Sequence, residues 1–136
     1  MLRDYEAVLK AASDPNRVRI LKMLEGGDLC VCQIVAVLGL AESTVSKHLS
    51  LLRAAGLIEE RKDGRWVHLR LAQERVNDYA LPLLSLIRQW MKKDTTIRAD
   101  AEKVARVRRL SVEELCDLGP QRLGKDWAVV KGGARG

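Results

Sequence analysis

The sequence lacks any uninterrupted apolar stretch close to the roughly 20 residues that a membrane-spanning helix needs. Charged residues interrupt every candidate window along its 136 residues. The opening segment MLRDYEAVLK also lacks the basic region followed by an apolar region that marks a secretory signal. We therefore expect a cytoplasmic protein without a membrane partner.

Cysteine is scarce, with three residues at Cys30, Cys32 and Cys116. An odd count in a reducing compartment argues against a disulfide framework, so we expect three thiols. The chain has no Cys-x-x-Cys motif in a βαβ setting, and neither of its two histidines is near the cysteine pair in sequence. We therefore expect no enzyme and no catalytic residues.

The composition favours a nucleic-acid partner. The formal net charge is +6, the pI is about 9.5, and 47% of the residues are hydrophobic. This content suffices for one modest core, and the positive charge favours polyanionic partners.

Two helices are predicted before residue 26. Apolar residues at helical spacing indicate a first helix over about 2–12. The second has Asp14 as its N-cap and Pro15 as its first residue, and it ends at the glycines 26–27.

A helix-turn-helix is predicted next. Asp28 can cap a third helix that ends at Gly39, and a fourth begins at Glu42 or Ser43 and ends at Gly56. Its predicted buried face consists of Val45, Leu49 and Leu52. The outer face of this helix is polar and basic, as in DNA-reading helices.

Residues 57–71 change to the alternating pattern of strands. Asp63 and Gly64 form a strong hairpin signal between the two predicted strands. Basic residues surround the tip, namely Arg61, Lys62 and Arg65. A basic hairpin directly after a helix-turn-helix indicates a winged helix.

The helix predicted over 77–93 is apolar on much of its circumference, so we expect a second copy of the chain to cover it. Pro82 lies in or near its first turn, or kinks it. The fold class is therefore mainly α with a β-hairpin wing, a winged helix-turn-helix with α-helical dimerisation elements at both ends.

The chain divides into a DNA-binding and dimerisation domain over 1–95 and a C-terminal extension over 96–136. Weak amphipathic character over 99–110 and a capping box of Ser111 with Glu114 predict partial helix in the extension. We expect its end, KGGARG, to be disordered.

These segments together resemble the ArsR (ArsR/SmtB) family of winged-helix metalloregulators, from about Tyr5 to Met91. The resemblance is carried by DPNRVRILKML, LCVCQI, STVSKHLSLLRAAGLI and RKDGRWVHLRL, in family order and spacing. DLCVCQI is most similar to the ELCVCDL box of arsenical-resistance repressors. The resemblance implies a repressor that leaves operator DNA when trivalent arsenic or antimony binds its cysteines.

The departures from the family pattern narrow the ligand set. One arsenical subgroup has a third cysteine where this chain has Val35. Cadmium- and lead-responsive relatives add cysteines on the N-terminal arm or the recognition helix, and this chain has none there. Zinc-type members use Asp, His and Glu on the last dimer helix, but residues 77–93 contain no histidine.

The spacing of the cysteine pair suggests a mechanism. On a regular helix, residues i and i+2 point about 200° apart, so Cys30 and Cys32 cannot grip one small ion there. Chelation by both sulfurs would require the first turn of that helix to open, which would disturb the recognition helix packed on it. We also expect the helix N-terminus to lower the thiol pKa.

Each cysteine also has a structural interpretation. Cys30 and Cys32 could be small core residues, since free cysteine is often buried. Cys116 could be the third ligand, or a half-buried helix residue.

The predicted DNA contacts lie on the recognition helix and the wing. They are Ser43, Thr44, Ser46, Lys47 and His48 on the helix, and Arg61, Lys62 and Arg65 on the wing. The alternative for each set is a solvated polar face.

The leading functional prediction is a homodimeric, metalloid-responsive repressor of double-stranded operator DNA with no constitutive cofactor. Its inducer would be As(III) or Sb(III), with trivalent organoarsenicals as a further option. The predicted metal ligands are Cys30, Cys32 and Cys116. The alternatives are a repressor that senses oxidation of Cys30 and Cys32 or another soft metal, a thiol enzyme, and an architectural DNA-binding protein without an inducer.

Overall fold

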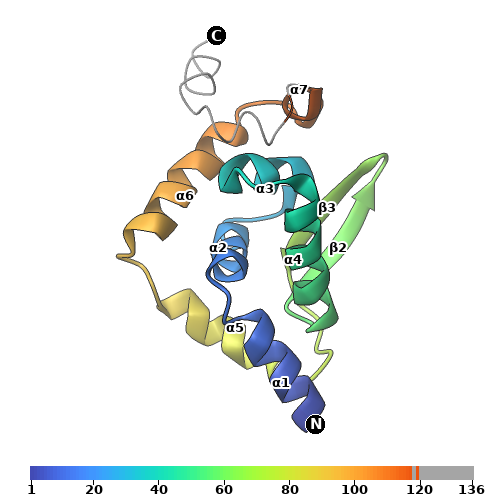
Figure 1. Ribbon diagram of the computed structural model, residues 1–136, viewed down its shortest axis with the longest axis vertical. Coiled ribbons are helices and arrows are strands. Elements are labelled where there is room, and N and C mark those ends of the chain that lie inside the picture. Colours follow the sequence, from blue (N-terminus) through green and yellow to red (C-terminus); the bar gives the residue numbers. More distant parts are fainter. Residues whose placement is uncertain (118, 120–136) are drawn as a thin grey trace.

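A computed structural model describes residues 1–117 and 119 (Figure 1). The elements in chain order are α1 (Leu2–Ala11), α2 (Pro15–Leu24), β1 (Leu29–Cys30), α3 (Val31–Leu38), α4 (Glu42–Ala54), β2 (Ile58–Asp63), β3 (Trp66–Leu71), α5 (Ala80–Gln89), α6 (Thr95–Val107) and α7 (Val112–Asp117). The mainly helical fold with a β wing is as predicted. The segment KGGARG lies outside the described residues.

The helix-turn-helix forms as its cap residues indicate. Asp14 caps α2 by accepting a 3.0 Å hydrogen bond from the backbone N–H of Arg17, and Pro15 is its first residue. Helix α3 ends at Gly39, whose φ of 68° is in the left-handed region that glycine adopts most readily. Helix α4 follows after a short turn, with α3 and α4 bent 115° relative to each other.

The start of α3 differs from the prediction. Asp28 is not its cap, because residues 29–30 are extended and form β1. Cys30 is the N-cap instead: its backbone N–H donates to Oε1 of Gln33 at 2.8 Å, and its sulfur receives the backbone N–H of Gln33. The prediction that both cysteines of the Cys-x-Cys pair lie on one helix is therefore wrong, since Cys30 lies before the helix and Cys32 lies in its first turn.

The sheet has three antiparallel strands in the order β1-β3-β2. The predicted wing hairpin is present, with Asp63 paired to Trp66 across a turn that contains Gly64 at a φ of 62°. The third strand, β1, was not predicted because it has two residues. Its pairing places Cys30 opposite His68 of the wing strand β3.

One apolar core joins the helices to the sheet, and α3 lies at its centre. Residues 33–38 of α3 are all buried, and the helix contacts α4, α6, α7, β1 and β3. The predicted buried face of α4 is confirmed, because Val45, Leu49 and Leu52 are 5% exposed or less. Figure 1 shows α3 between α6 on one side and α4 with the wing on the other.

Helix α5 is shorter than the predicted 77–93. It ends at Gln89, followed by extended Trp90 and by Met91 at a φ of 63°. The buried ammonium of Lys22 donates to the backbone oxygens of Ile87 at 3.0 Å and Trp90 at 2.9 Å. These bonds satisfy carbonyl groups that a helix end leaves without partners. Pro82 lies in the first turn.

Helix α6 is held to the body by a buried ion pair. Arg19 of α2 donates from Nε and Nη2 to the two carboxylate oxygens of Asp100, at 2.8 and 3.0 Å. Asp100 is 3% exposed, and its hydrogen bond raises the pKa of the Arg19 guanidinium. Through this pair and the buried residues Val104 and Val107, α6 packs on α2 and α3.

Within the described residues, no single helix is long and apolar enough to cross a membrane. The helices α3 and α4 reach that length and apolarity only when taken together across their bend.

Replacing Asp100 with Ala would leave the Arg19 charge partly buried without its partner. We expect the free energy of unfolding to fall by about 2–4 kcal/mol, less than for a fully buried pair because the Arg19 side chain is 22% exposed. Urea unfolding of the reduced protein measures this change. The control is Glu102→Ala, which removes a carboxylate from an exposed position on the same helix, and an equal loss in both variants would contradict a specific role for the ion pair.

Candidate functional site

The recognition helix α4 presents a polar face opposite its buried stripe. Ser43, Thr44, Ser46 and Lys47 are all exposed in the first half of the helix. Burial of Val45 and Leu49 fixes the rotation of α4, so these four side chains point away from the core. The face is open to a large partner such as the DNA major groove.

His48 has a different position from the other predicted DNA contacts. Its side chain is 14% exposed and faces the start of α2. Its Nδ1 is 3.3 Å from Nη1 of Arg17 and 4.0 Å from a carboxylate oxygen of Asp14. These contacts orient α4 against α2, and a DNA contact by His48 stays a prediction.

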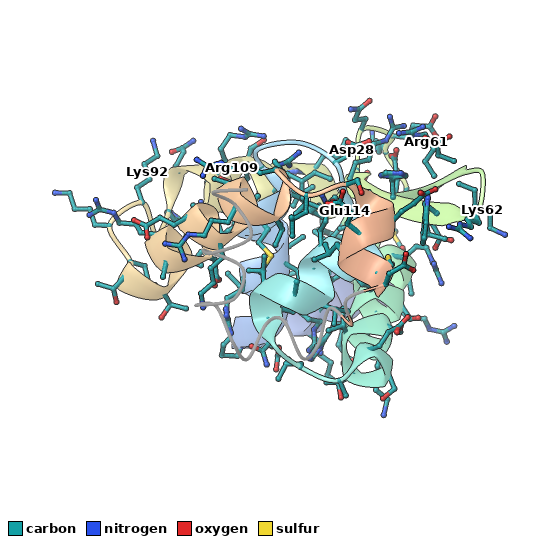
Figure 2. All side chains as sticks on the ribbon, turned by 90° about the horizontal axis from the view of Figure 1, so that it is seen from above. Asp28, Arg61, Lys62, Lys92, Arg109 and Glu114 are labelled. Carbon is teal, nitrogen blue, oxygen red and sulfur yellow. A yellow bond between two sulfur atoms is a disulfide. The ribbon has the colours of Figure 1, made fainter. Side chains whose placement is uncertain are left out.

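Arg61 and Arg65, the two wing arginines predicted to contact DNA, each lie next to a carboxylate from outside the wing. Nη2 of Arg61 is 3.7 Å from Asp28, and Nη2 of Arg65 is 3.7 Å from Glu113 of α7. The guanidinium of Arg65 also lies 4.5 Å from the centre of the Trp66 ring. Lys62 is exposed on the wing. Figure 2 shows Asp28 beside Arg61, whereas Lys62 lies farther out at the far end of the wing.

Sequence reasoning did not find the carboxylate partners of the wing. The sequence predicts Asp28 to be a helix cap, and Glu113 is far from the wing in the chain. The excess of positive charge indicated a DNA-binding surface, but no local pattern indicates which acidic residues reach it. Only the packing of α7 brings Glu113 to Arg65.

All three cysteines lie at or beside the N-terminal end of α3, and we call them the cysteine cluster. Cys116 of α7 is joined to Cys32 by a disulfide, with their Cα atoms 5.7 Å apart. Cys30 stays a thiol and is 2% exposed. The expectation of three free thiols is therefore wrong for Cys32 and Cys116 in this structure. The reason is that α6 and α7 pack on α3 and bring Cys116 within bonding distance of Cys32.

The protonation of Cys30 also differs from expectation. Burial raises the pKa of this thiol, although backbone N–H groups at the start of α3, chiefly that of Gln33, act in the opposite direction. Loss of hydration disfavours the thiolate more than the helix N-terminus favours it. The predicted lowering of the pKa is wrong for Cys30.

The cysteine cluster can supply soft sulfur ligands once Cys32 and Cys116 are reduced. Their backbones are already close enough for the two sulfurs to share one atom, and Cys30 is two residues from Cys32. Within residues 1–117 and 119, no group of three or more His, Cys, Asp or Glu side chains is arranged to hold a metal ion. Ligation by all three sulfurs would therefore require a local change.

A further surface combines α1 with α5, which lie together in Figure 1. The rings of Tyr5 and Tyr79 meet edge to face at 5.6 Å. Large apolar side chains of α1, of α5 and of the C-cap of α5 are between 40 and 83% exposed: Leu2, Tyr5, Leu9, Leu86 and Trp90. This surface includes the two helices that were predicted to mediate dimerisation.

Comparison with known proteins agrees with this architecture. The family described as "Bacterial regulatory protein, arsR family" matches residues 14–60. The chain is 34% identical over 112 residues to the arsenical resistance operon repressor of Escherichia coli K12, covering 80% of this chain and 86% of that protein. It is 40% identical over 72 residues to an HTH-type transcriptional regulator of Methanocaldococcus jannaschii, covering 52% and 81%.

A solved structure extends the comparison to three dimensions. HlyU from Vibrio cholerae N16961 superimposes with a TM-score of 0.55 and 29% identity, covering 64% of this chain and 90% of that one. Sequence similarity over most of both chains, together with the winged helix-turn-helix, shows that this chain is a transcriptional regulator of the ArsR family.

Proposed function

We propose that the protein is a dimeric repressor that binds operator DNA and leaves it when As(III) or Sb(III) binds Cys30, Cys32 and Cys116. The observation that carries the proposal is that Cys116 is joined to Cys32 in the first turn of α3, two residues from Cys30 at the N-cap. Soft thiolates suit trivalent arsenic and antimony. The arsenical resistance repressor of E. coli, similar over most of its length, supports the same inducer class.

Ligation is a substitution that leaves arsenic in its trivalent state. Three As–S bonds form and three As–O bonds of arsenous acid break, and each thiol proton leaves with a hydroxide as water. A methylated trivalent arsenical keeps its As–C bond and needs two thiols. In the reducing cytoplasm, where we propose that the repressor acts, Cys32 and Cys116 would be thiols.

The position of Cys30 links ligation to DNA binding. Because Cys30 is extended and paired with His68, bringing its sulfur toward Cys32 and Cys116 would disturb β1 and the first turn of α3. Helix α3 packs directly on α4, so this movement would displace the exposed face that includes Ser43 and Lys47. Inducer and DNA would therefore bind antagonistically.

The operator is proposed to be a pseudo-palindrome read by two copies of the chain. The exposed apolar side chains of α1 and α5 would form the interface of a two-fold dimer, which supports this proposal. Two recognition helices would then contact half-sites about one helical turn of DNA apart.

Replacing Lys47 with Gln should weaken DNA binding by roughly tenfold, because one cation of the recognition helix would be lost. The slope of log K against log salt concentration should become shallower by about one. Fluorescence anisotropy measures both effects, with a labelled duplex selected from a random pool by the reduced protein. The control is Lys92→Gln, at an exposed position far from the wing in Figure 2. Equal losses in both variants would show that only net charge matters.

Arsenite should lower the affinity of the reduced, oxygen-free protein for the same duplex by about 5- to 150-fold, the usual range of coupling between two sites. Cys116→Ser should weaken this response and spare the response to a methylated trivalent arsenical, since Cys30 and Cys32 remain. Cys32→Ser should impair both responses.

Each variant is first titrated with DNA alone, to confirm that DNA binding is intact before ligand is added. Unchanged anisotropy of the parent protein in excess arsenite would refute the metalloid proposal. Equal arsenite responses of Cys116→Ser and the parent would return Cys116 to a structural role.

A second candidate function is thiol oxidation sensing, which the Cys32–Cys116 disulfide favours. With peroxide as oxidant, one S–S bond forms, the O–O bond breaks, and two thiol protons with two electrons convert the peroxide to two waters. The predicted oxidising pair of Cys30 and Cys32 is wrong in this structure, because Cys32 is joined to Cys116 and Cys30 stays a thiol. Cys30 would therefore take no part in this reaction. Cys30→Ser should therefore still release DNA in peroxide and should no longer release it in arsenite. If the parent protein releases DNA in peroxide but never in arsenite, the protein is a redox sensor.

A further inference from the structure

Helix α7 joins the cysteine cluster to the wing. It packs on α3, where Cys116 meets Cys32. Three residues earlier on the same helix, Glu113 lies 3.7 Å from Arg65 at the tip of the wing. One short element therefore contacts both the proposed sensing site and a residue proposed to bind DNA.

The contact with Glu113 involves the same positive charge of Arg65 that a DNA phosphate would need. Arg65 attracts phosphate only through its guanidinium, which lies over the Trp66 ring and faces the Glu113 carboxylate. A carboxylate at this distance offsets the positive charge and repels an approaching phosphate. Glu113 and a DNA phosphate therefore compete for Arg65.

The attachment of α7 depends on few contacts. The helix has six residues, too few to be stable alone in water. Among the described residues of α7, Leu115 is the buried one, at 0% exposure, and Cys116 supplies the covalent link to α3. Breaking that link leaves a short helix anchored by one buried side chain, so the position of Glu113 depends on the state of Cys116.

We propose that α7 is an autoinhibitory element. When Cys116 is joined to Cys32, directly or through a bound arsenic atom, α7 holds Glu113 against Arg65 and lowers the attraction of the wing for DNA. When Cys116 is a free thiol, α7 loosens and Arg65 becomes available to phosphate. The identity of the signal rests on the proposed function, but the contact between α7 and the wing does not.

The other wing ion pair provides an internal comparison. Arg61 faces Asp28, which precedes β1 and is not part of α7. A change in the state of Cys116 should therefore leave this pair in place. The proposal assigns the switching effect to Arg65 and not to Arg61.

The test compares Glu113→Gln with Glu114→Gln. Both changes remove one negative charge from an exposed position of α7, but Glu114 forms no ion pair with any of the described residues. Each full-length variant is measured with the labelled duplex in two states, reduced by a phosphine, and oxidised by diamide, which accepts the two thiol hydrogens as the disulfide forms.

Oxidised Glu113→Gln should bind DNA about two- to fivefold more tightly than the oxidised parent, the range that one exposed ion pair contributes. Its salt slope should be steeper by about one, since Arg65 regains a phosphate contact. Reduced Glu113→Gln should match the reduced parent, and oxidised Glu114→Gln should match the oxidised parent. In an Arg65→Gln background, Glu113→Gln should have no effect in either state.

Equal gains from Glu113→Gln and Glu114→Gln, or a gain that persists without Arg65, would overturn the proposal. So would equal effects of Glu113→Gln in the reduced and oxidised states. If arsenite fails to release DNA from the parent while the oxidised Glu113→Gln protein gains affinity, the proposed inducer is wrong and the autoinhibitory contact is supported.

Discussion

The burial of α3 is the constraint on which the other functional elements depend. Residues 33–38 of this helix are buried, because α4, α6, α7 and the sheet all pack around it. A helix enclosed on all sides cannot move without moving its neighbours, since close-packed interiors transmit small shifts. Cys30 and Cys32 lie at its N-terminal end. A chemical event there would, on our proposal, reach both the recognition helix and the wing.

The two proposals describe physically different routes from the cysteines to the DNA-binding surface. The first is mechanical and runs from Cys30 through β1 and the first turn of α3 to α4. The second is electrostatic and runs from Cys116 through Glu113 to Arg65. A packing route acts over short distances and in discrete steps, whereas charge competition is graded and weakens with salt. The Arg19–Asp100 pair supports the second route because it holds α6, and with it α7, against the body.

Several predictions from the sequence were confirmed because local interactions dominate them. Asp14, Pro15 and Gly39 mark helix ends through their own backbone preferences and side-chain bonds, and the buried stripe of α4 follows from helical periodicity. Asp28 failed as a cap because a two-residue strand pairs with β3, and no local pattern reveals a partner so distant in the chain. The same limit applies to Cys116, which reaches Cys32 across a sequence separation of 84 residues.

The sequence alone determined the winged helix-turn-helix, the polar outer face of α4 and the presence of two cysteines one residue apart, because periodicity, turn residues and residue chemistry are local properties. Only the tertiary structure decided that Cys30 stands outside α3 with a raised pKa, that His48 faces α2, and that α7 brings Cys116 to Cys32. It also brought carboxylates to Arg61 and Arg65. These outcomes depend on burial and on contacts between distant segments, which arise when the whole core packs.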